Sequence, residues 1–187
     1  MVDVAQISRI LKRHFDVTHM VNWDLDDQGR VQVWGHIRLV GGTLKHGQIP
    51  LQFGRVSGDF IAKSCELNSL VGAPDHVGRD FDVRMNNLTM LTLGPHHVAG
   101  SYMLIDNPLT SLAGLSDHVG EGLYLSYDEN LPLLRLVQQR AVYWDTQYAP
   151  PMAVKKIIND YMGKGKTHML NLALELKQAG YGSNAKW

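Results

Sequence analysis

The sequence has one cysteine, no long apolar run and no excess of charge of either sign. With Cys65 alone among 187 residues, no intramolecular disulfide can form, and such cysteine usage is typical of a reducing, intracellular setting. No stretch of about 18 apolar residues occurs, so no membrane span is predicted. The N-terminal stretch MVDVAQISRILKRHF lacks the apolar core and cleavage site of a signal peptide.

Basic and acidic residues balance, because 18 Lys and Arg face 18 Asp and Glu. This balance argues against a dedicated nucleic-acid or membrane-surface protein. The distribution is uneven, however: residues 24–150 are acidic overall, whereas residues 151–187 are basic. The basic segment contains a cluster that is either a solvated helix face or a contact for nucleic acid or an acidic protein. The cluster consists of Lys155, Lys156, Lys164 and Lys166.

An internal repeat of 21 residues is the main positive feature of the chain. The stretch NNLTML at residues 86–91 returns as NPLTSL at residues 107–112. At this period, five apolar columns coincide over three registers: Leu67, Leu88 and Leu109; Leu70, Leu91 and Leu112; Val77, Val98 and Val119; Phe81, Tyr102 and Leu123; Val83, Leu104 and Leu125. A fixed period of this length is the signature of a solenoid, in which stacked coils bury a shared core.

Each unit follows the pattern L-x-x-L-x-G-x-P-x-x-V-x-G-x-F-x-V-x-x-N-x. The V-x-G-x-F-x-V part alternates with period two and predicts one short strand per coil, stacked in parallel on its neighbours. Glycine and proline before it predict a turn. Asn87, Asn107 and Asn130 stand where the chain must bend into the next coil, and we expect their amides to bond to neighbouring backbone.

The flanks read as covers for the open ends of the solenoid. Residues 4–15 predict a helix with Asp3 as its N-cap and with Val4, Ile7, Leu11 and Phe15 on one face. The stretch VNWDLDDQGRVQVWG predicts a hairpin. After APP at 149–151, two apolar stripes predict helices: Val154, Ile157, Ile158 and Tyr161; Met169, Leu172, Ala173 and Leu176.

The sequence therefore predicts an α+β fold. It is a short right-handed, leucine-rich-repeat-like β-solenoid with parallel strands, capped by an N-terminal helix and hairpin and by C-terminal helices. The expected divisions are an N-terminal helical cap (1–23), the repeat solenoid (24–148) and a C-terminal helical region (149–187), together one compact domain.

The repeat resembles the 21-residue leucine-rich-like units, LTSLxGaPxxVgGxFdCxxNxLTSL, of many bacteriophage-encoded hypothetical proteins. Here the units read LNSLVGAPDHVGRDFDVRMNN, LTMLTLGPHHVAGSYMLIDNP and LTSLAGLSDHVGEGLYLSYDEN. Val83 and Leu104 stand where the family usually has Cys, and the third unit has lost its Pro. The resemblance implies a small phage accessory protein in the cytoplasm of the infected bacterium, and it supplies no established activity.

Three histidines share one repeat column, so His76, His97 and His118 are expected to form a ladder on one edge. A ladder presents parallel rings, not the convergent set that a metal needs. The histidines are therefore either solvated loop residues or a pH-sensitive or partner-contacting stripe.

Three aromatic residues, Tyr143, Trp144 and Tyr148, follow the last coil. They either seal the core or anchor a partner.

Three other motifs carry little chemistry. GKGKT at 163–167 lacks the spacing and the preceding strand of a phosphate-binding loop, so a helix–helix linker is expected. Asp24 and Asp26 flank a turn, which explains them without catalysis. Cys65 is expected to be a buried, inert thiol.

No constellation predicts catalysis or a cofactor. We expect a non-catalytic protein-binding module whose partner is a host bacterial factor, such as a defence-system component or the transcription machinery. The alternative is a nucleic-acid-associated protein that uses the basic C-terminal helices; an enzyme and a virion component are the weaker readings. The ends of two solenoids can also pair, so a homodimer is a further alternative.

Overall fold

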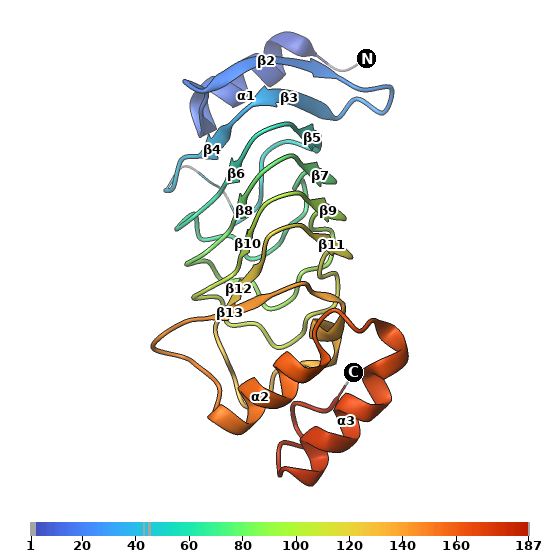
Figure 1. Ribbon diagram of the computed structural model, residues 1–187. Coiled ribbons are helices and arrows are strands. Elements are labelled where there is room, and N and C mark those ends of the chain that lie inside the picture. The colour runs from blue at the N-terminus through green and yellow to red at the C-terminus, as the bar shows by residue number, and fades with distance from the viewer. Residues whose placement is uncertain (1–2, 43, 45, 187) are drawn as a thin grey trace.

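The chain forms a β-solenoid of about five turns with a helical cap at each end (Figure 1). The computed structural model describes residues 3–42, 44 and 46–186. Sheet A has seven strands in the order β1 (Phe15–Asp16), β4 (Ile37–Leu39), β6 (Phe60–Ile61), β8 (Phe81–Asp82), β10 (Tyr102–Met103), β12 (Leu123–Leu125) and β13 (Val142–Trp144). Sheet B has six strands in the order β11 (His118–Val119), β9 (His97–Val98), β7 (His76–Val77), β5 (Phe53–Val56), β3 (Val31–Gly35) and β2 (Met20–Leu25).

From β5 to β12, neighbouring strands of each sheet pair in parallel at the 21-residue interval that the sequence predicts. His76 lies opposite His97, and Phe81 lies opposite Tyr102. Antiparallel pairing occurs at the N-terminal end, where β1 joins β4 and β2 joins β3. The predicted solenoid with parallel strands is therefore confirmed, and its first coil is closed by a hairpin and a short strand.

The single strand predicted for each coil is in fact two short strands in different sheets. In the first repeat unit, residues 67–87, β7 and β8 are separated by a bend over residues 78–80. The bend continues the ladder, because Gly78 N donates to Val56 O at 2.8 Å. Side chains reinforce it: Asp59 Oδ1 accepts from Asp80 N at 3.0 Å, and Asp80 Oδ1 accepts from Ser101 N at 2.8 Å. Period-two alternation continues through such a bend, so the alternation alone could not reveal it.

The apolar repeat columns fill the space between the sheets, as predicted. Most of their members are fully buried, including Val56, Val77, Val98, Phe60, Phe81 and Tyr102 at 0 % exposure. The aromatic members form a continuous row, with centroid distances of 5.4 Å from Phe60 to Phe81 and 5.0 Å from Phe81 to Tyr102. Stacking of coils thus buries side chains that one coil could not bury alone.

A second set of repeat positions holds asparagines, whose side-chain amides form hydrogen bonds with the backbone. The Asn86 amide accepts from Cys65 N and Leu67 N and donates to Ala62 O, Val83 O and Arg84 O. One coil later, Asn107 accepts from Leu88 N and donates to Val83 O and Leu104 O. These amides join successive coils at the bend after sheet A.

The predicted asparagine role therefore holds for Asn107 and was wrong for Asn87, which is exposed beside buried Asn86. Asn130 is exposed too; its side chain lines no buried bend, and the buried Asn184 binds Leu131 O at 2.8 Å there instead. Cys65 occupies the Asn86 column one coil earlier, and its thiol donates to Leu39 O at 3.4 Å. Burial, followed by the nearby Asp82 carboxylate, raises the pKa of the Cys65 thiol to about 11, which fits an inert thiol.

The N-terminal cover is α1 (Val4–His14) followed by β1. Asp3 is its N-cap, as predicted, because Oδ1 accepts from Ala5 N at 2.9 Å. Ile7, Leu11 and Phe15 are buried, whereas Val4 is 56 % exposed and does not belong to the packed face. The hairpin β2–β3 is confirmed. Its turn is held by Asp26, which accepts from the backbone N of Gln28 and Arg30 and pairs with the Arg30 side chain.

The C-terminal cover comprises η1 (Leu134–Gln138), α2 (Met152–Tyr161), η2 (Lys166–His168) and α3 (Met169–Gln178). Both helices bury the predicted stripes, except that Tyr161 and Ala173 are only partly buried. Gly163 and Gly165 have φ of 72° and 79°, so GKGKT is a linker with left-handed glycines. The edge of sheet B is closed by side chains, since Gln139 Nε2 donates to Ser116 O and Arg140 Nη1 donates to Gly120 O.

Tyr102→Phe is expected to stabilise the protein. Tyr102 is 0 % exposed, and within the described residues its hydroxyl has no hydrogen-bond partner; burial raises its pKa. A buried unpaired hydroxyl costs about 1–3 kcal/mol, and Phe keeps the ring that packs on Phe81. We expect the free energy of unfolding to rise by about 1 kcal/mol in urea denaturation. Lower stability of the variant would show that the hydroxyl is satisfied.

Candidate partner-binding surface

Sheet A presents a single outward-facing column, which we call the outer stripe. Strand register places its members in line: Arg38, Ile61, Asp82, Met103, Tyr124 and Tyr143. They alternate with buried positions on each strand, so they lie on the outer face of the sheet. The stripe runs the length of the solenoid toward the C-terminal cover.

The middle of the outer stripe carries a closed ion pair. The Arg84 guanidinium binds Asp82 with two contacts, from Nε to Oδ1 at 2.9 Å and from Nη2 to Oδ2 at 2.7 Å. Donating these hydrogen bonds to Asp82 raises the pKa of Arg84, and Asp82 is only 7 % exposed. The charges of Asp82 and Arg84 cancel, so the chemistry of the outer stripe is determined by its other residues.

Toward the C-terminal end the outer stripe is apolar and aromatic. Tyr124 and Tyr143 stack with a centroid distance of 4.8 Å and an interplanar angle of 22°. The Tyr143 ring also lies over Gly122, where an added Cβ would come within 2.5 Å of Cε2. Tyr143 is nevertheless 50 % exposed. It is thus an exposed aromatic side chain that is already held in one orientation.

The other two predicted aromatic anchors lie in different environments. Trp144 follows Leu125 in an inward column, is partly buried and meets Tyr127 edge-on at 6.2 Å. It therefore seals the end of the core. Tyr148 is 49 % exposed, and its carbonyl accepts from Tyr127 N at 2.7 Å. Tyr148 is one of the residues that line a cavity of about 600 Å³ beside the end of the outer stripe.

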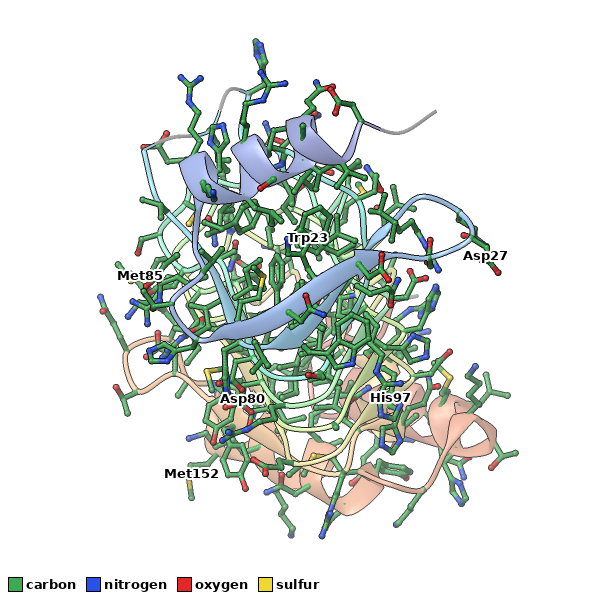
Figure 2. The ribbon with its side chains drawn as sticks, turned by 90° about the horizontal axis from the view of Figure 1, so that it is seen from above. Trp23, Asp27, Asp80, Met85, His97 and Met152 are labelled. Carbon is green, nitrogen blue, oxygen red and sulfur yellow. The ribbon has the colours of Figure 1, made fainter. Side chains whose placement is uncertain are left out.

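The three predicted histidines form a stack on the outer face of sheet B. Centroid distances are 5.9 Å from His76 to His97 and 4.3 Å from His97 to His118. Arg55 continues the row, because it pairs with His76 in register. The stack lies on sheet B and the outer stripe on sheet A, so they are separate surfaces. Figure 2 shows His97 on a different side of the solenoid from Asp80, in the bend between the sheets.

The histidine stack does not form a metal centre. Among residues 3–42, 44 and 46–186, no three His, Cys, Asp or Glu side chains converge as ligands. Partial burial lowers the pKa of His97, and the neighbouring charges of His118, His76 and Arg55 lower it further. These surroundings favour the neutral form of the His97 ring.

This arrangement predicts stability that falls with acidification. Because the folded state lowers the pKa of His97, the unfolded chain binds that proton more readily. The stabilising contribution is complete above the ordinary pKa of 6.5 and is lost as pH falls below it. We expect His97→Gln to reduce the loss of unfolding free energy between pH 7.5 and 5.5 in urea titrations. Equal pH dependence in both proteins would contradict this assignment.

The four lysines of the predicted cluster fall into two pairs, one within α2 and one after it. Lys155 and Lys156 lie in its first half, whereas Lys164 and Lys166 follow its C-terminus. Lys164 Nζ lies 5.0 Å from the Tyr161 ring centroid. No ion pair holds any of the four among the described residues. They are solvated cations, partly or fully exposed, around one end of the molecule.

Comparison with known proteins assigns no family. No family model, curated protein or solved structure matches the chain. Among the helices of the described residues, none is long and apolar enough to cross a membrane. Function must therefore be argued from the surface itself.

Proposed function

We propose that this chain is a non-catalytic protein-binding module whose contact surface is the aromatic end of the outer stripe. The carrying observation is Tyr143, half exposed yet fixed against Tyr124 and Gly122. An aromatic side chain that is already ordered loses little entropy on binding, and tyrosine is enriched at binding hot spots. Met103 in the same column and the nearby Tyr148 extend the surface.

The resemblance of the repeat to phage-encoded units supports a partner from the infected bacterium. On this proposal, the protein is a phage accessory protein in the host cytoplasm. It binds and inhibits or redirects a host factor, such as a defence-system component or the transcription machinery. The solenoid acts as a rigid support that holds the aromatic residues in register.

The test is affinity capture from bacterial lysate with the tagged protein, washed at low and at high salt. We expect one host protein at near-stoichiometric yield that survives high salt, since apolar contacts are weakly screened. Tyr143→Ala should reduce its recovery roughly tenfold or more. Leu170→Ala is the control, because Leu170 is also a large exposed apolar side chain, at 71 %, and belongs to α3 instead of sheet A.

Two outcomes would overturn the proposal. Undiminished recovery with Tyr143→Ala would exclude the outer stripe as the contact surface. Recovery of only salt-labile, nuclease-sensitive material would favour the nucleic-acid alternative. That material should then be lost on replacing the four basic side chains of the C-terminal region, Lys155, Lys156, Lys164 and Lys166.

A further inference from the structure

The cavity beside Tyr148 adjoins the aromatic end of the outer stripe. Its wall includes Ser126, which is the next residue after Tyr124 that faces outward from the same coil. Residues two apart on an extended segment are separated by about 7 Å. A partner that covers Tyr124 and Tyr143 therefore reaches the cavity without bending away from the surface.

Two carboxylates line this cavity without a basic partner. Within the described residues, Asp106 forms no side-chain hydrogen bond or ion pair. Among the same residues, the Asp128 carboxylate accepts only from Asn130 N, at 2.7 Å. The described lining contains no Lys, Arg or His. The cavity therefore holds acidic charge that no residue of its own wall balances.

The backbone that carries Asp106 is held in place on both sides. Asp106 has φ of 58°, and Ser64 and Met85 adopt the same left-handed conformation in the two preceding coils. Asp106 N donates to Ser126 Oγ at 3.1 Å, and Asn107 binds three backbone groups. The carboxylate thus projects from a fixed bend.

The remaining walls suit a side chain with an apolar stem and a planar cationic head. The lining includes the ring-bearing residues Tyr127, Tyr148 and Pro108 and the polar residues Asn130 and Thr110. A guanidinium donates up to five hydrogen bonds, pairs with carboxylates in two-pronged geometry and stacks on aromatic faces. An ammonium offers a point charge without the stacking plane.

We propose that this cavity receives an arginine side chain of the protein partner that covers the outer stripe. The proposal rests on the proposed function and names the chemistry of the partner: a basic segment with arginine next to an apolar contact. Charge complementarity supports it beyond the cavity, because residues 24–150 carry an excess of acidic side chains.

The test uses a blocked Gly-Arg-Gly peptide and its citrulline counterpart, titrated into the ¹⁵N-labelled full-length protein. Citrulline keeps the shape of arginine and removes the charge. We expect saturable amide shifts confined to residues 106–110, 126–130 and 148 with the arginine peptide, at millimolar affinity. The citrulline peptide should bind at least fivefold more weakly.

A charge-matched pair of variants separates the site from the general acidity of the surface. Asp106→Asn with Asp128→Asn should weaken binding of the arginine peptide at least fivefold. Asp27→Asn with Asp117→Asn removes the same charge from exposed positions elsewhere and should leave binding unchanged. The spectrum of each variant verifies its fold.

Equal binding of both peptides, or equal weakening by both variant pairs, would overturn the arginine site. The peptide titration involves no host protein, so this failure is distinct from failure of the proposed function. If capture of a partner still depends on Tyr143 but the cavity does not prefer the arginine peptide, only the proposal of an arginine site is overturned.

Discussion

Asn86→Ala is expected to lower the free energy of unfolding by about 3–5 kcal/mol. The side chain is 6 % exposed and binds five backbone groups from two segments of the chain, residues 62–67 and 83–84. In the alanine variant, Cys65 N, Leu67 N and Ala62 O lose their bonds to the amide, whereas Val83 O and Arg84 O keep bonds from Asn107 Nδ2 and Ser64 N. Each buried backbone group left without a partner costs about 1–3 kcal/mol. Some of the cost is recovered if water enters, which is why the expected loss is smaller than the sum.

Asn87→Ala is the matched control for this experiment. Asn87 is the same residue type at the adjacent position, but it is exposed. Its replacement should change the unfolding free energy by less than about 0.5 kcal/mol, as for most surface substitutions. Urea denaturation followed by circular dichroism measures both. Similar losses for the two variants would mean that the buried amide does not hold the coils together.

The coil architecture could be predicted because burial imposes it on the sequence. A residue inside a stacked coil must be apolar in every coil, so Val77, Val98 and Val119 reveal the register directly. The bends could not be placed to the residue. Asn86 and Asn87 are identical in type, and the left-handed Met85 decides which amide faces inward. Nothing in the apolar pattern indicates that conformation.

The candidate surface was harder to predict than the core. The histidine stack was evident because one residue type repeats in one column. The outer stripe contains different residue types, namely Ile61, Asp82, Met103 and tyrosines. Positions that face solvent need not all be apolar, so they show no repeating residue type. In addition, Tyr143 follows its neighbour Tyr124 by 19 residues, so the period of 21 does not align them. Asp106 and Asp128 lie in successive coils and line one cavity, which the chain after β13 completes with Tyr148.

Phe81→Ala is expected to cost about 3–5 kcal/mol of unfolding free energy. Phe81 is 0 % exposed and contacts Phe60 in the coil before it and Tyr102 in the coil after it. The space left by the ring cannot close easily, because parallel pairing of β6, β8 and β10 fixes the distance between coils. Phe81→Leu refills most of the volume and should cost less than about 1.5 kcal/mol.

The position of Phe81 also predicts where the damage extends. Each coil contacts only its neighbours, so weakening one interface reduces the coupling between the parts of the solenoid on either side. Hydrogen exchange should then show faster exchange of backbone amides in β6, β8 and β10 than in β3 of the same variant. Uniform acceleration over the whole chain would instead indicate that the solenoid unfolds as one cooperative unit. In that case the cost of Phe81→Ala would report on global stability and not on one interface between coils.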